Sequence, residues 1–65
     1  RRNPPKTLLL EAEIRGECGD YNEVTRLLNL AFCRTPENEE TPQIYQKIRD
    51  LGERFSVSVP ILLPT

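Results

Sequence analysis

The sequence predicts a mostly α-helical protein: a helical hairpin followed by a third amphipathic helix and an extended apolar tail. Two segments carry apolar residues at helical spacing, and each begins with residues that favour a helix N-terminus. The composition of the 65 residues, 37% hydrophobic and 29% charged, is typical of a globular domain. We expect a flexible basic arm at 1–6, one helical domain at 7–55 and the tail at 56–65.

The first element, residues 7–17, is compatible with either a helix or a strand. Leu8, Leu10, Ala12 and Ile14 alternate with other residues, and a period of two indicates a half-buried strand. The segment is nevertheless rich in Leu, Glu, Ala and Arg, which are strong helix formers. A helix, which we favour, would place Leu10, Ile14 and Cys18 on one row and Leu8 with Ala12 on another.

The strand alternative defines a different fold class, α+β, with the order β-α-α-β. Residues 7–15 would pair with residues 55–61, and both helices would cover one face of the sheet. A two-stranded sheet is marginal by itself, so this fold predicts a sheet completed by dimerisation.

The second element is predicted as a helix over about 21–33. Asp20 is a good N-cap, and Glu23 can complete a capping box with it. Arg34 lies where the negative end of the helix dipole favours a cation. The apolar stripe consists of Tyr21, Val24, Leu27, Leu28 and Ala31.

The third element follows a polar linker at 35–40 and is predicted as a helix over about 42–55. Thr41 is placed to act as an N-cap, with Pro42 at the first helical position. The apolar stripe, at spacings of four, three and four, consists of Ile44, Ile48, Leu51 and Phe55.

The apolar tail should not remain in water. It can pack on the helices, pair with the first segment or contact another chain. The residues predicted to make tail or oligomer contacts are Val57, Val59, Ile61, Leu62 and Leu63.

Composition argues against several kinds of function. The chain has no histidine, so the most common general base and metal ligand is missing. Cys18 and Cys33 are too few for a structural zinc site or a secreted disulfide scaffold, and we expect reduced, half-buried thiols and an intracellular location. A helical hairpin would hold the two cysteines about 20 Å apart, which forbids a disulfide.

No signal peptide is visible, and the lack of an initial Met indicates a trimmed chain or a domain from a longer protein. We expect no enzyme, cofactor or metal.

The segment from Leu8 to Pro36 resembles a tetratricopeptide repeat, most closely in its second half. The resemblance rests on Gly19-Asp20-Tyr21-Asn22-Glu23-Val24, Leu27-Leu28, Ala31 and Pro36, with Ala12 at the small position of the first helix. It implies that the first helix forms a binding groove from Leu9, Glu13 and Gly16. It also implies that one and a half repeats belong to a longer array or to a small adaptor that self-associates.

The favoured function is therefore a non-enzymatic protein–protein interaction module, a TPR-like adaptor within a larger protein or assembly. Its partner would be another protein or a peptide segment. The alternative is a structural domain for homo-oligomerisation through the tail. A nucleic-acid-binding ribbon-helix-helix domain is disfavoured by the acidic centre of the chain and by Glu11 and Glu13 in its first segment. No partner membrane is expected, because no apolar run approaches the roughly 18 residues that span one.

Overall fold

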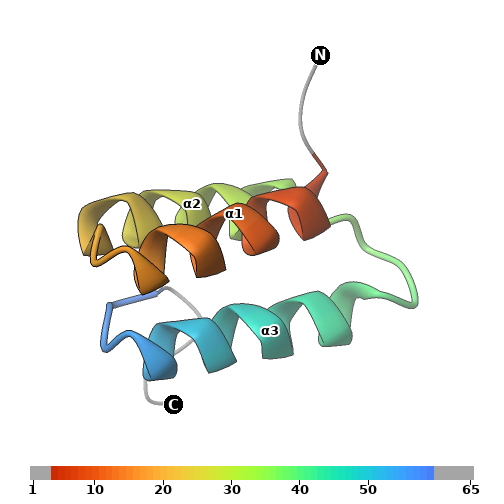
Figure 1. Cartoon of the computed structure of the whole chain (residues 1–65). Helices are drawn as coiled ribbons and strands as arrows, with labels where there is room; N and C mark the ends of the chain where they lie inside the picture. Colours follow the sequence, from red (N-terminus) through yellow and green to blue (C-terminus); the bar gives the residue numbers. More distant parts are fainter. Residues whose placement is uncertain (1–3, 60–65) are drawn as a thin grey trace.

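The computed structural model describes residues 4–59. This range contains three α-helices: α1 (Pro5–Glu17), α2 (Tyr21–Arg34) and α3 (Thr41–Arg54). The described residues contain no strand, so the fold is mostly α and the β-α-α-β alternative is wrong. α1 and α2 form an antiparallel hairpin, and α3 packs beneath it and runs parallel to α1 (Figure 1).

Helix α1 begins two residues earlier than the sequence predicts, so the expected arm at 1–6 overlaps its first turn. Pro4 is extended, with ψ of 159°, and its carbonyl accepts a hydrogen bond from the Leu8 amide. Pro5 then occupies the first helical position, where the missing amide costs nothing. The tandem prolines therefore start the helix.

The core face of α1 contains Leu8, Leu9, Ala12 and Gly16, all of which are buried. Leu10 and Ile14, one turn apart on another row, remain largely exposed. The helix prediction for this segment is confirmed. The choice between its two apolar rows depends on where α2 and α3 lie.

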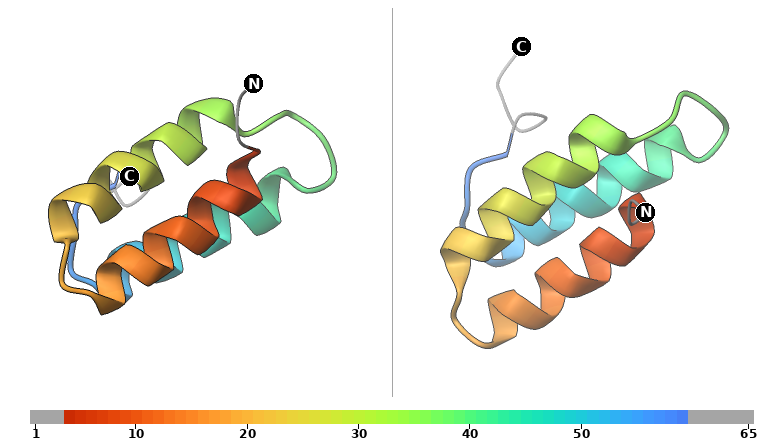
Figure 2. Two further views of the ribbon diagram at one scale, coloured as in Figure 1. Left: turned by 45° about the horizontal axis from the view of Figure 1, so that its top comes forward. Right: turned by 90° about the horizontal axis from the view of Figure 1, so that it is seen from above.

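A three-residue turn, residues 18–20, joins α1 to α2. The Gly19 amide donates to the carbonyl of Gly16, and the Asp20 amide donates to the carbonyl of Arg15, which is the Schellman pattern. Gly19 has φ of 84°, a conformation that glycine adopts without steric cost. The chain thus reverses within three residues and places the two helices side by side (Figure 2).

Asp20 caps α2 as predicted, but only half of the capping box forms. The Asp20 carboxylate accepts a hydrogen bond from the Glu23 amide at 3.4 Å. The Glu23 carboxylate turns instead to Arg26, one turn along the exposed face. That hydrogen bond lowers the pKa of Glu23.

Thr41 does not cap α3 as the sequence suggested. The helix begins at Thr41 itself, and Glu40 is the N-cap without a side-chain cap hydrogen bond. The Thr41 hydroxyl instead donates to the Pro36 carbonyl and accepts from the Asn38 amide, the latter at 2.8 Å. This hydroxyl therefore stabilises the linker between α2 and α3.

Helix α3 ends in a second Schellman turn, centred on Ser56. The Ser56 amide donates to the carbonyl of Glu53, and the Val57 amide donates to the carbonyl of Gly52. Ser56 adopts φ of 57°, an uncommon conformation for a residue with a side chain. The turn directs the following residues back over the molecule, and Val59 becomes buried, with 5% of its surface exposed.

One hydrophobic core joins the three helices and the beginning of the tail. Leu27 and Leu28 of α2 and Ile48 of α3 are its largest fully buried side chains together with Val24. Phe32 and Tyr45 stack at its edge with ring centroids 5.2 Å apart. The buried hydrophobic residues are Leu8, Leu9, Ala12, Val24, Leu27, Leu28, Ala31, Ile44, Ile48, Leu51 and Val59.

Candidate functional site

The three residues of the predicted binding groove lie against α3. Leu9 belongs to the core with 4% of its surface exposed, and Gly16 is buried. Glu13 is half-buried and forms an ion pair with Arg54. Helix α3 thus covers most of the face that we expected to be open: Glu13 and Gly16 lie against its C-terminal end, and Leu9 also borders a pocket between the two helices. Partner binding by these three residues stays a prediction.

At their C-terminal halves α1 and α3 are closely joined; we call this region the closed end and define it as Glu13, Gly16, Glu17, Arg54 and Phe55. The Arg54 guanidinium donates to Glu13 at 3.0 Å and to Glu17 at 2.8 Å. The hydrogen bonds that the guanidinium donates, to Glu13 above all and then to Glu17, raise the pKa of Arg54. Through these two ion pairs Arg54 links the two helices.

The ring of Phe55 completes the closed end because Gly16 has no side chain. A Cβ at position 16 would lie 2.4 Å from the ring, far inside the contact distance. The guanidinium of Arg54 lies 5.0 Å from the ring centroid, and the Tyr21 ring lies 6.3 Å away on the other side of the turn. Glycine at this position is what allows α1 and Phe55 to pack together.

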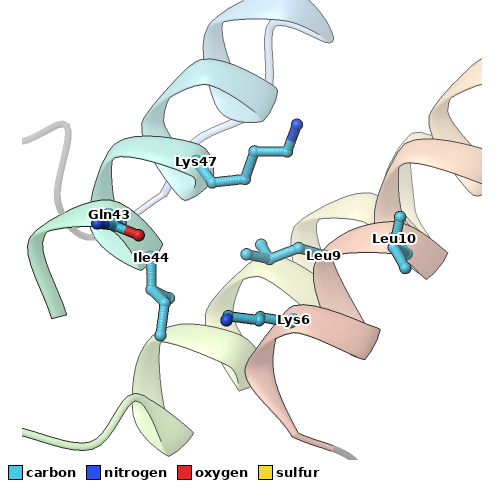
Figure 3. A pocket seen from close by; sticks show the side chains of 6 residues that line it. All are labelled: Lys6, Leu9, Leu10, Gln43, Ile44 and Lys47. Carbon is cyan, nitrogen blue, oxygen red and sulfur yellow. The ribbon is translucent and has the colours of Figure 1, made fainter. Parts of the chain in front are cut away.

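At their N-terminal halves the same two helices leave a pocket of 290 Å³. We call this region the open end and define it by its lining residues, which Figure 3 shows coming from both helices: Lys6, Leu9, Leu10, Gln43, Ile44 and Lys47. Leu9 and Ile44 form an apolar floor between the helices, and both are core residues. Leu10 stands at the outer wall with 63% of its surface exposed.

The rim of the open end is cationic. Lys6 extends from α1 and Lys47 extends from α3, while none of the lining residues is acidic (Figure 3). Lys6 forms an exposed ion pair at 3.2 Å with Glu40, which belongs to the linker. Lys47 has no ion pair within residues 4–59. The open end therefore combines an apolar floor with two ammonium groups.

The open end was not predicted from the sequence, although the second apolar row of the first helix was a signal for it. Leu10 and Ile14 were correctly placed on a separate helical row, but nothing in the sequence showed that this row stays outside the core. Ile14 is 62% exposed, almost the same as Leu10, yet it does not line the pocket.

The remaining candidate groups are the two cysteines and the acidic residues. Cys18 and Cys33 are both unpaired and exposed, so the expected half-buried thiols are not found. Within the part of the chain that the structure describes, no three His, Cys, Asp or Glu side chains are grouped to hold a metal ion.

No helix in the described range is both long enough and apolar enough to cross a membrane.

The predicted tail contacts are divided between described and undescribed residues. Val57 is half-buried against the core and Val59 lies within it, so both pack on this chain's own helices. Ile61, Leu62 and Leu63 lie outside the described residues.

No protein-family model, no curated protein and no solved structure matches this chain. The tetratricopeptide resemblance therefore stays a prediction. The hypothesis about function rests on the geometry of the molecule alone.

Proposed function

We propose that this protein is a non-enzymatic interaction module that binds a peptide segment of another protein. The observation that carries the proposal is the open end, where two helices leave an apolar pocket next to an exposed leucine. Apolar surface on a small protein is costly to leave in water, and binding a partner would cover it.

The open shape of the pocket favours a side chain as the ligand. Small-molecule sites usually enclose about 300–1,000 Å³ and bury most of the ligand. The open end has 290 Å³ and lies at the surface between two helices. It suits one apolar side chain whose backbone continues over Leu10, which is how peptides commonly anchor in a groove.

The alternative of homo-oligomerisation through the tail has less support. Val59 is buried in the chain's own core, and Val57 packs on the same core. The described part of the tail therefore packs on this chain's own helices, and only the half-buried Val57 keeps some apolar surface exposed.

Selection from a random-peptide display library tests the proposal. We expect the full chain to enrich peptides that the Leu10→Asn variant binds more weakly. Ile14→Asn is the matched control, because Ile14 is equally exposed but lies outside the pocket. Failure to enrich any peptide, or an equal loss in both variants, would contradict a peptide site at the open end.

A further inference from the structure

We infer that the partner segment is acidic, with carboxylate side chains on both sides of one apolar anchor. This inference rests on the proposed function, because it specifies which peptide the open end binds. The carrying observation is the juxtaposition of an apolar floor with two lysines that approach it from different helices (Figure 3).

The floor determines the apolar anchor. Leu9 and Ile44 present hydrocarbon at the base of the pocket, and the only uncharged polar side chain in the lining is that of Gln43. Burial of an apolar side chain there releases water from both surfaces. A charged or strongly polar anchor would lose its hydration without obtaining a partner at the floor.

The rim determines the flanking charges. Lys6 and Lys47 lie on opposite sides of the floor, so a chain that crosses it passes one ammonium group before the anchor and the other after it. Lysine acts as a flexible point charge and can adjust to carboxylates at several backbone positions. Charge complementarity therefore selects acidic residues near the anchor.

Glu40 shows that a carboxylate can bind at this rim. Its side chain reaches from the linker and lies 3.2 Å from the Lys6 ammonium group, with both side chains largely exposed. An exposed ion pair of this kind is weak and can be exchanged for another. Glu40 therefore acts as an internal competitor that a carboxylate of the partner replaces.

The same charges disfavour a second copy of this chain as the occupant. In a two-fold symmetric dimer through the open end, the patch would face itself and the lysines of both copies would meet. Like charges brought together at an interface are repulsive.

A titration of the full, isotope-labelled chain with three synthetic peptides tests the inference, with amide NMR shifts as the readout. The peptides share a central leucine and differ only in the flanking residues, which are glutamate, glutamine or lysine. We expect the glutamate peptide to bind most tightly, to shift residues of the open end, and to weaken as salt is added.

Variants of the rim make the test specific. Lys6→Gln and Lys47→Gln should each weaken binding of the glutamate peptide about two- to fivefold, the usual size of one exposed ion pair. Glu40→Gln should strengthen binding because it frees Lys6. Arg49→Gln is the matched control, since Arg49 is exposed and lies on the opposite side of α3 from Lys47.

The possible failures are distinguishable. If all three peptides bind at the open end with equal affinity, the charge inference is wrong and the proposed function stands. If the glutamate peptide shifts residues elsewhere, or if Arg49→Gln weakens it as much as Lys47→Gln, the inference is also wrong. If no peptide binds and the display selection enriches none, both the charge inference and the proposed function are wrong.

Discussion

The two ends of the α1–α3 interface are formed by the same pair of parallel helices, but the helices pack closely at one end and leave a pocket at the other. At the closed end, carboxylates of α1 meet Arg54, and a glycine allows the Phe55 ring to pack against the backbone. At the open end, α1 and α3 both supply lysines, and leucine and isoleucine side chains leave a pocket between them.

This difference shows how one helix pair can combine stability with binding. Opposite charges and a close glycine–aromatic contact fix the helices at one end. Like charges at the other end cannot pair with each other, so the surface there stays available. Changes that alter one end at a time should therefore affect stability and binding separately.

Gly16→Leu should break the closed end. The new side chain must occupy space that the Phe55 ring now fills, because even a Cβ would lie 2.4 Å from it. We expect a loss of about 2 kcal/mol in the free energy of unfolding, within the usual range for overpacking. Urea denaturation followed by circular dichroism measures the loss.

A double variant is the control for that experiment. Phe55→Ala should cost less in the Gly16→Leu background than in the wild-type protein, because the ring has already been displaced. Additive losses would contradict direct contact between position 16 and the ring.

Ser56→Gly should stabilise the turn that follows the closed end. Ser56 has φ of 57°, and glycine removes the steric cost of that conformation. The gain should be about 0.5 kcal/mol, since the greater flexibility of unfolded glycine offsets part of it. Thermal and urea unfolding measure the change.

The reverse exchange in the other Schellman turn is the matched control. Gly19 has φ of 84°, and a Cβ added to it would meet no atom within 4 Å, so Gly19→Ser tests conformation without a clash. We expect a loss of about 1 kcal/mol. If both exchanges shift stability in the same direction, the backbone explanation is wrong.

Arg54→Gln should weaken the closed end slightly. It removes the two ion pairs to α1, but all three side chains are partly exposed and solvent screens them. We expect a small decrease in the midpoint of thermal unfolding that disappears at high salt. Arg49→Gln should leave the midpoint unchanged at every salt concentration; an equal decrease in that control would show that net charge, rather than the ion pairs, is responsible.

Lys47→Glu should make the open end resemble the closed one. The rim would then carry one carboxylate and one ammonium group, as the closed end carries carboxylates and a guanidinium, and the new carboxylate would repel those of the peptide. Stability should change very little, while binding of the glutamate peptide should be lost. Retained binding of that peptide would remove Lys47 from the proposed site.

Much of the fold follows from local patterns in the sequence. The second and third helices were predicted to within one residue at each end, because an N-terminal signal and a strong apolar stripe agree in both. The first segment was ambiguous because its apolar residues fit two periods, and it begins earlier than predicted because Pro5 starts the helix.

The candidate site was predicted less well. The expected groove residues, Leu9, Glu13 and Gly16, do lie on one face of the first helix, as their spacing requires. What the spacing could not show is that α3 covers this face. Likewise, the Thr41 hydroxyl was predicted as a cap, but its partners are Pro36 and Asn38 in the linker.

The sequence by itself determined the second and third helices and the Asp20 cap, and it favoured a helix for the first segment, because these depend on interactions among residues close together in the chain. Only the tertiary structure decided which apolar row of α1 is buried, which carboxylates meet Arg54 and where the two helices leave a pocket. Those outcomes depend on how α2 and α3 lie against α1, and the position of α3 is set by contacts between residues some 40 positions apart, such as Gly16 and Phe55.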